Sequence, residues 1–141
     1  MKISTKGRYA LRLMIALARN EDEGYLALRD VSGQEDISTK YLEQIVTLLS
    51  RAGFLKSVRG AQGGYRLARD PAEYTAGEIL RAAEGDLFPV SCLGNEPVGC
   101  ERAEQCATLE FWLGMQKAID QYVDSVTLAD LANGKEWGPD C

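Results

Sequence analysis

The chain has 141 residues, 45% of them hydrophobic and 26% charged, a composition that supports a folded apolar core and excludes a disordered chain. It contains no histidine, which excludes Ser–His or Cys–His catalysis and any histidine metal ligand from the chain itself. No window approaches the ~20 consecutive apolar residues of a membrane span, and the first residues lack the apolar stretch of a signal peptide, so we expect a soluble cytoplasmic protein.

The net charge of −5 is distributed unevenly along the chain. Residues 1–70 hold 12 Lys and Arg against 8 Asp and Glu, whereas residues 71–141 hold 4 against 13. Attraction to phosphates is screened within about 8–10 Å at cellular salt, so a local basic patch matters more than the total charge. The asymmetry favours a basic binding half followed by an acidic half with another role, and chance unevenness is the alternative.

The first half of the chain predicts two helices before residue 35. The first covers about residues 6–20, where apolar residues recur at intervals of four, and Ser4 and Thr5 are suitable N-caps. A short second helix covers about residues 28–33. The first is amphipathic with one apolar stripe, and the second is expected to carry Val31 inward.

A third helix is predicted to follow a turn and to run from its N-cap, Ser38, to Ala52. Its apolar residues fall on one face, and its other face is polar. Two short helices joined by a tight turn, with a polar face on the second, are typical of a helix-turn-helix DNA-binding unit.

A β-hairpin is predicted directly after this third helix, with strands over residues 54–58 and 65–67. The connecting residues 59–64 include three glycines, which permit unusual backbone dihedrals and close approach of other groups. A phosphate-binding nucleotide loop is the competing interpretation, but no Lys-Ser/Thr follows the glycines and the loop leads into a strand. The hairpin is therefore predicted to be the wing of a winged helix.

Several side chains of this half suit contacts with DNA. Gln44 can pair with adenine, Glu43 can accept from cytosine, Arg51 can hold a phosphate, and Arg59 can enter a minor groove. The start of the third helix favours a phosphate through its free N–H groups. The alternative is that these are ordinary solvated positions. The predicted DNA-binding residues are Ser38, Thr39, Lys40, Tyr41, Glu43, Gln44, Arg51, Arg59, Gly60 and Gly64.

The second half is predicted to be a sensor and dimerisation region, residues 73–141, following a winged helix-turn-helix domain, residues 1–72. It begins with a helix that Thr75 and Glu78 would open as a capping box. A loop over residues 86–106 follows, which is long for a compact domain and indicates function or disorder.

Three cysteines lie in that loop, in the spacing Cys92-x7-Cys100-x5-Cys106. Three thiolates on one loop can converge on one metal centre, and both iron–sulfur clusters and structural zinc prefer thiolate ligands. Zinc sites commonly use pairs two to four residues apart, which this loop lacks. A disulfide with one free thiol is a further alternative, disfavoured in a reducing cytoplasm.

A long helix is predicted over about residues 107–124, with a last short helix after residue 127. Its apolar residues recur every three or four positions, which resembles a coiled-coil seam, and packing onto its own domain is an equally supported alternative. A single winged helix covers little DNA, so two modules reading a two-fold operator are expected. The predicted dimer-interface residues are Leu109, Trp112, Ile119 and Val123.

These elements predict a mainly α fold with a small β-hairpin: a winged helix-turn-helix domain, a cysteine-loop segment and a long dimerisation helix. Four segments and the cysteine loop resemble a known family, the bacterial winged-helix transcription regulators of the IscR type, which include CymR-, NsrR- and RirA-like members. The segments are residues 2–10, 41–44, 58–65 and 125–131, and the likeness covers nearly the whole chain.

The resemblance implies a homodimer with the long helix at its interface and a helix-turn-helix in which Glu43 and Gln44 face bases. It also implies that Cys92, Cys100 and Cys106 bind a 2Fe–2S cluster whose occupancy controls iron–sulfur assembly genes, with the protein acting as a repressor. The alternative is a regulator of cysteine or sulfur metabolism, or of redox or nitric oxide stress, that senses through a thiol switch, zinc or a partner protein. An enzyme is not expected, because no nucleophile–base pair is visible.

The fourth cluster ligand is a departure from the family pattern. Leu109 stands where the best-known members have a histidine, and Arg8 stands where a nitric-oxide-sensing branch has an acid from the partner chain. The CymR-like branch lacks the three cysteines, so their presence argues against that branch. The candidates for the fourth ligand are Glu104, Glu110, Cys141, a carboxylate of the other subunit, or a small molecule.

Overall fold

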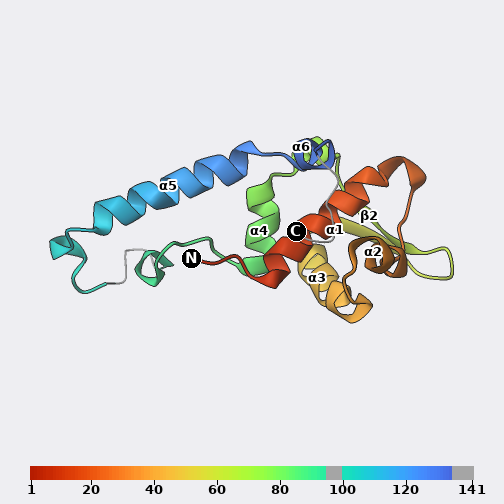
Figure 1. Cartoon of the computed structure of the whole chain (residues 1–141), viewed down its shortest axis with the longest axis horizontal. Helices are drawn as coiled ribbons and strands as arrows, with labels where there is room; N and C mark the ends of the chain where they lie inside the picture. The colour runs from red at the N-terminus through yellow and green to blue at the C-terminus, as the bar shows by residue number, and fades with distance from the viewer. Residues whose placement is uncertain (95–99, 135–141) are drawn as a thin grey trace.

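The computed structural model describes residues 1–94 and 100–134, in which helices predominate and one antiparallel hairpin is present (Figure 1). None of the helices in these ranges is long and apolar enough to cross a membrane. The main elements are α1 (Thr5–Arg19), α2 (Leu28–Glu35), α3 (Thr39–Arg51), β1 (Leu55–Val58), β2 (Gly64–Leu67), α4 (Ala76–Glu84), α5 (Leu109–Ser125) and α6 (Leu128–Ala132). Short 3₁₀ turns are η1 (Glu21–Glu23), η2 (Pro71–Glu73), η3 (Ser91–Gly94) and η4 (Ala103–Gln105).

The predicted fold class is confirmed, and local capping explains why the elements begin where they do. Ser38 caps α3 by accepting a hydrogen bond from the Tyr41 amide at 3.2 Å. Thr75 and Glu78 form the predicted capping box at the start of α4. α2 extends two residues beyond its predicted end because Asp36 adopts a left-handed conformation, φ 53°, which ends the helix there.

The sequence predicts that Ser4 or Thr5 caps the N-terminus of α1. In the structure this end of the helix is capped by a residue from a distant part of the chain. The Ser4 side chain makes no capping bond within α1. Instead, Glu84 at the end of α4 accepts hydrogen bonds from the amides of Ser4 and Gly7 at 2.8 and 3.0 Å. A carboxylate at this position satisfies free N–H groups and complements the helix dipole, so α1 and α4 are joined by charge as well as by packing.

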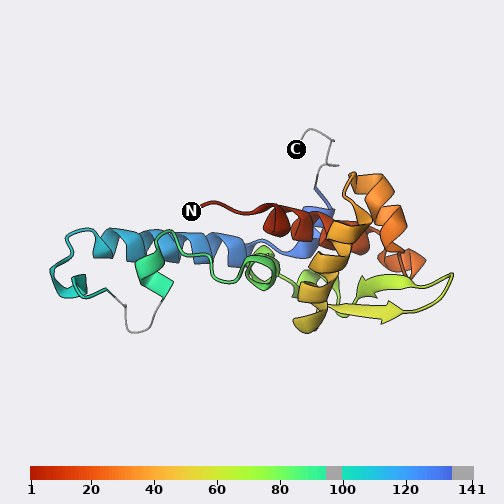
Figure 2. The same ribbon diagram turned by 90° about the horizontal axis from the view of Figure 1, so that it is seen from below.

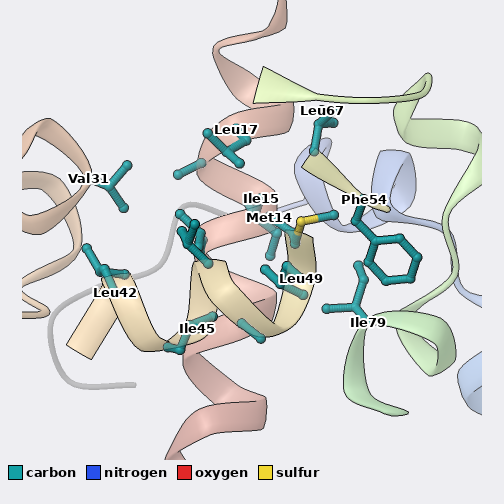
Figure 3. Packing of buried hydrophobic residues seen from close by; sticks show 14 of the residues in the cluster. Met14, Ile15, Leu17, Val31, Leu42, Ile45, Leu49, Phe54, Leu67 and Ile79 are labelled. Carbon is teal, nitrogen blue, oxygen red and sulfur yellow. The ribbon is translucent and has the colours of Figure 1, made fainter. Parts of the chain in front are cut away.

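A single apolar core is built around α1, against which α3, α4 and the hairpin pack (Figure 3). Leu13 and Met14 of α1 are fully buried in it. The core continues past residue 72, the predicted domain boundary, because Tyr74, Ile79 and Leu128 are also fully buried and belong to the same cluster. Both parts of the chain therefore share one core. The division at residue 72 into a DNA-binding part and a sensor part stays a prediction.

Tyr74 ties the base of the wing to this core. Its hydroxyl donates to the Phe54 carbonyl at 2.7 Å and accepts from the Arg69 amide at 3.0 Å, so it bonds just outside both strands. The Arg69 guanidinium lies 4.3 Å from the centre of the Tyr74 ring, and the Phe54 ring meets that ring edge to face. The wing is therefore held at its root by a buried side chain from the segment before α4.

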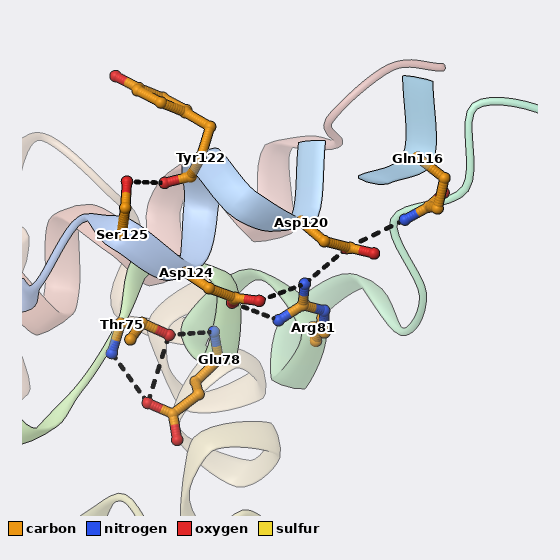
Figure 4. A network of polar contacts seen from close by, with 8 residues as sticks. All are labelled: Thr75, Glu78, Arg81, Gln116, Asp120, Tyr122, Asp124 and Ser125. Atoms are coloured by element: carbon orange, nitrogen blue, oxygen red, sulfur yellow. Dashed lines mark hydrogen bonds and ion pairs between the residues drawn. The ribbon is translucent and has the colours of Figure 1, made fainter. Parts of the chain in front are cut away.

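Helix α5 leaves this body and extends well beyond it, with the cysteine loop running back along it (Figures 1 and 2). Its C-terminal half is held against α4 by Arg81, which pairs with Asp120 and Asp124, each at 2.7 Å (Figure 4). The hydrogen bond to Asp124 is the main reason that the pKa of Arg81 lies above its ordinary value. Gly77 lets the helices approach, because an added Cβ there would lie 2.9 Å from a Val123 methyl group.

Candidate nucleic-acid interface and cysteine loop

Helix α3 presents the predicted reading face to solvent. It buries Leu42, Ile45, Val46 and Leu49 completely or nearly so, which fixes its orientation on the core. The opposite face is free for a ligand. The predicted DNA-binding residues exposed here are Ser38, Thr39, Lys40, Glu43, Gln44 and Arg51.

Tyr41 differs from the other predicted DNA-binding residues because it is half-buried. Its ring meets the Tyr9 ring edge to face, with centroids 5.5 Å apart, and so links the start of α3 to α1. Arg8 and Arg12 lie 5.9 and 5.5 Å from the centre of the Tyr9 ring. Arg12 is bonded to Glu35, whereas Arg8 is exposed and donates a hydrogen bond to the Thr5 hydroxyl at 3.2 Å.

The wing is shaped by glycines at its turn and at the start of β2, the strand that follows the turn. Gly60 has φ of 114°, a conformation that side chains disfavour, and it follows the exposed Arg59 at the end of β1. Gly64 lies directly against the Leu26 backbone, where an added Cβ would meet the carbonyl group. Leu26 and Tyr65 exchange two backbone hydrogen bonds of 2.9 Å there. The predicted Gly60 and Gly64 therefore set the shape of the wing through their backbones.

The basic side chains of this surface have no acidic partners in the part of the chain that the structure describes. The ion pairs there join Arg12 to Glu35 and Arg81 to two aspartates. Lys40, Arg51 and Arg59 take part in none of them and are exposed. Their charges are available to an anionic ligand such as DNA.

The cysteine loop follows α4 and leads into α5. Cys92 in η3 and Cys100 are half-buried, Cys106 at the end of η4 is exposed, and all three are free thiols. Cys141 lies outside the described residues, as do residues 95–99 of the predicted loop. Within residues 1–94 and 100–134, no three Cys, Asp or Glu side chains are close enough together to hold a metal ion.

The donor chemistry of this loop nevertheless suits a thiophilic centre. A hydrogen bond between the Cys106 sulfur and the Thr108 hydroxyl, at 3.3 Å, lowers the pKa of the Cys106 thiol below its ordinary value. A thiol with a lowered pKa is more often present as thiolate, the form that binds metals and reacts with oxidants. Three thiols fit three positions of a four-ligand site, and the side chains of Glu104 and Glu110 are exposed nearby in the sequence.

Helix α5 has two apolar faces, and the predicted dimer residues occupy only one of them. Their side chains are half-buried, and Val123 packs against α4 near Gly77. On the outer face, Phe111, Met115 and Tyr122 are 65%, 41% and 72% exposed. The half-buried residues are Leu109, Trp112, Ile119 and Val123. The predicted seam is thus partly covered within its own chain, as the own-domain alternative expects, and the exposed outer face is a second apolar surface that could serve a dimer.

Comparison with known proteins decides the family. Residues 3–134 match the Rrf2 family, described as iron-dependent transcriptional regulators. The chain belongs to the Rrf2 family. Members of this family are DNA-binding transcription regulators and not enzymes, in agreement with the winged helix-turn-helix and its exposed reading face.

Two groups of Rrf2 regulators resemble the chain over almost its full length. CymR of Bacillus subtilis is 44% identical over 133 residues, 94% of this chain and 91% of that one. The structure of B. subtilis CymR, the global cysteine regulator, aligns with a TM-score of 0.80 at 42% identity, covering 96% of this chain and 99% of CymR.

IscR is also similar. The IscR of Serratia proteamaculans is 35% identical over 136 residues, 96% of this chain and 82% of that one. The structure of T. potens IscR aligns with a TM-score of 0.74 at 37% identity, covering 97% of this chain and 94% of IscR. Sequence identity and TM-score are thus somewhat higher for CymR than for IscR. The three-cysteine loop, by contrast, is the feature by which the sequence resembles IscR-type regulators.

Proposed function

We propose that this Rrf2 protein works in the cytoplasm as a homodimer that represses transcription from a two-fold operator. The exposed polar face of α3, next to a wing that ends in Arg59, is the observation that carries the proposal. Glu43 and Gln44 read bases in the major groove, and Arg59 enters the adjacent minor groove. Ser38, Thr39, Lys40, Tyr41 and Arg51, with the Gly60 and Gly64 backbones, contact or orient toward phosphates.

A first test removes the wing arginine. Arg59→Ala is expected to weaken operator binding by about 1–3 kcal/mol, because an arginine in a narrow minor groove gains from the enhanced negative potential there. Binding should be measured by titration of a fluorescent duplex, selected from random sequences with the wild-type protein. Glu23→Ala, on an exposed turn away from the reading face, serves as the control. Unchanged affinity of Arg59→Ala would exclude minor-groove insertion.

We further propose that the regulator responds to sulfur or cysteine status through thiol chemistry in its own loop. Similarity to CymR over the whole chain supports a role in sulfur metabolism. The lowered pKa of the Cys106 thiol supports a thiol-based signal, since thiolates react where thiols do not. Reaction of one or two cysteines would then alter operator affinity.

The second candidate is a 2Fe–2S cluster that reports on iron–sulfur assembly, as the likeness to IscR suggests. The specific observation in its favour is the presence of three cysteines in one loop. Cys92, Cys100 and Cys106 would supply three thiolates to the cluster. Because occupancy of the cluster would depend on iron supply, the charge and the conformation of the loop would depend on it too. The fourth ligand is a non-histidine group, with Glu104, Glu110 and Cys141 as the candidates from this chain.

One measurement separates the two candidates: iron and acid-labile sulfide per chain, with a visible spectrum, on protein purified without oxygen. About two irons and two sulfides per chain, lost in Cys100→Ser, would establish the cluster. Metal-free protein whose operator affinity changes on mild oxidation, and does not change in Cys106→Ser, would establish the thiol switch. Bound zinc would contradict both candidates and would indicate a structural metal site instead.

A further inference from the structure

Two cationic side chains lie directly opposite each other on the wing. In the antiparallel register, Lys56 of β1 pairs with Arg66 of β2. Successive residues of a strand point to opposite faces, and the neighbouring pair, Leu55 and Leu67, points toward the core, with Leu67 buried. Lys56 and Arg66 therefore share the outer face of the hairpin.

Like charges directly opposite on a hairpin destabilise it, so this pair is costly to the free protein. No carboxylate pairs with either residue within the described ranges. The Arg66 guanidinium is instead held 5.5 Å from the centre of the Tyr25 ring, which fixes its position without neutralising it. Lys56 is exposed. The wing thus carries two neighbouring positive charges that no described carboxylate neutralises, and an anionic ligand could bind to them.

The distance of this pair from the wing tip matches the dimensions of a DNA groove. Arg59 lies three residues beyond Lys56, which corresponds to about 10 Å along a strand at about 3.3 Å per residue. A minor groove is about 7.5 Å deep, so a wing that inserts Arg59 carries the residues about 10 Å behind it to the groove rim. The rim is formed by the phosphate backbones.

We propose that Lys56 and Arg66 form a phosphate-binding pair that grips the DNA backbone beside the groove entered by Arg59. This inference rests on the proposed mode of DNA binding. The pair contacts phosphates and not base edges, so it contributes affinity and position but no sequence preference. Tyr25 keeps the Arg66 guanidinium in place, so that less side-chain freedom is lost on binding.

The test is a salt series on Lys56→Gln and Arg66→Gln. Each variant should be titrated with the selected duplex and with a mixed-sequence duplex of equal length. A plot of log affinity against log salt concentration has a negative slope. Each lost phosphate contact should make this slope shallower by about 0.9 for every wing bound. Affinity for the two duplexes should fall by the same factor, leaving the preference for the selected duplex unchanged. The free Lys56→Gln protein should melt at the same temperature as the wild type or higher, because a repulsion is removed.

Matched variants separate a local contact from a general effect of charge. Arg102→Gln removes the same charge from the exposed surface of the cysteine loop and should leave the slope unchanged. Lys56→Arg and Arg66→Lys retain the charge and should retain the slope. Unchanged slopes in both Gln variants, or a loss confined to the selected duplex, would overturn the phosphate pair while leaving the DNA-binding proposal intact. Wild-type affinity that did not depend on salt would instead overturn the DNA-binding proposal.

Discussion

Replacing Phe111 and Tyr122 together by glutamate is expected to convert the protein to a monomer and to lower its affinity for a two-fold operator about a hundredfold or more. Both side chains are largely exposed on the outer face of α5, at 65% and 72%, and Met115 lies between them. Their spacing along the helix keeps the three on one stripe, the pattern of a helix that packs against a second helix. Glutamates there would have to be buried without partners on dimerisation, which is costly.

The expected loss in affinity follows from linkage between the two reading units. When one unit of a dimer binds its half-site, the second binds from a high effective concentration, which contributes about 10² to 10⁴ in affinity. Sedimentation would give the oligomeric state, and titration with the selected duplex would give the affinity. Lys117→Glu, also exposed on α5 but off this stripe, is the control and should stay dimeric.

The same experiment discriminates between the two faces of α5. A double variant that stays dimeric would leave the half-buried seam, Leu109, Trp112, Ile119 and Val123, as the interface. In that case Val123 would have to separate from α4 to reach a partner, because it packs near Gly77 within one chain.

Gly64→Ala is expected to destabilise the fold by about 3 kcal/mol and to weaken operator binding at least tenfold. An added Cβ would meet the Leu26 carbonyl group and would lie 2.8 Å from the Ala27 nitrogen, and backbone atoms cannot rotate away as a flexible side chain can. Overpacking of this kind costs about 1–3 kcal/mol, and the rigid neighbours favour the upper end. The wing would shift away from α2 as the two Leu26–Tyr65 hydrogen bonds lengthen.

Chemical denaturation would measure the stability, and duplex titration the binding. Gly33→Ala is the matched control: it lies in α2, has no atom within 4 Å of its added Cβ and has no left-handed backbone. It should stabilise the protein by about 0.5–1 kcal/mol through helix propensity. A Gly64→Ala protein as stable as the wild type would show that the contact between β2 and the Leu26 backbone tolerates displacement.

Much of the fold could be predicted because its determinants are local. The caps at Ser38 and Thr75 lie within three residues of the groups they satisfy, and the buried stripe of α3 repeats with the helical period. The exposed reading residues, such as Glu43 and Gln44, follow from that same stripe, since they occupy the positions that it leaves free.

Contacts between distant parts of the chain could not be predicted in this way. Glu84 caps α1 from 77 to 80 residues away, and Tyr74 bonds outside both ends of the hairpin. The orientation of α5 was ambiguous for a physical reason, because Trp112 and Phe111 both belong to apolar stripes and the periodicity alone does not say which one is covered. Spacing along the loop likewise identifies three thiols but does not fix the distances between them.

The long reach of α5 gives the cysteine loop a mechanical advantage. The helix has 17 residues, which corresponds to about 25 Å at about 1.5 Å per residue. It is fastened near its C-terminal end by Arg81, while the loop is attached to its free end and to the end of α4. A tilt of about 5° at that fastening would displace the far end of this 25 Å lever by about 2 Å. A displacement of about 2 Å at the loop end of α5 would therefore tilt the helix by about 5° at the ion pairs that fasten it to α4.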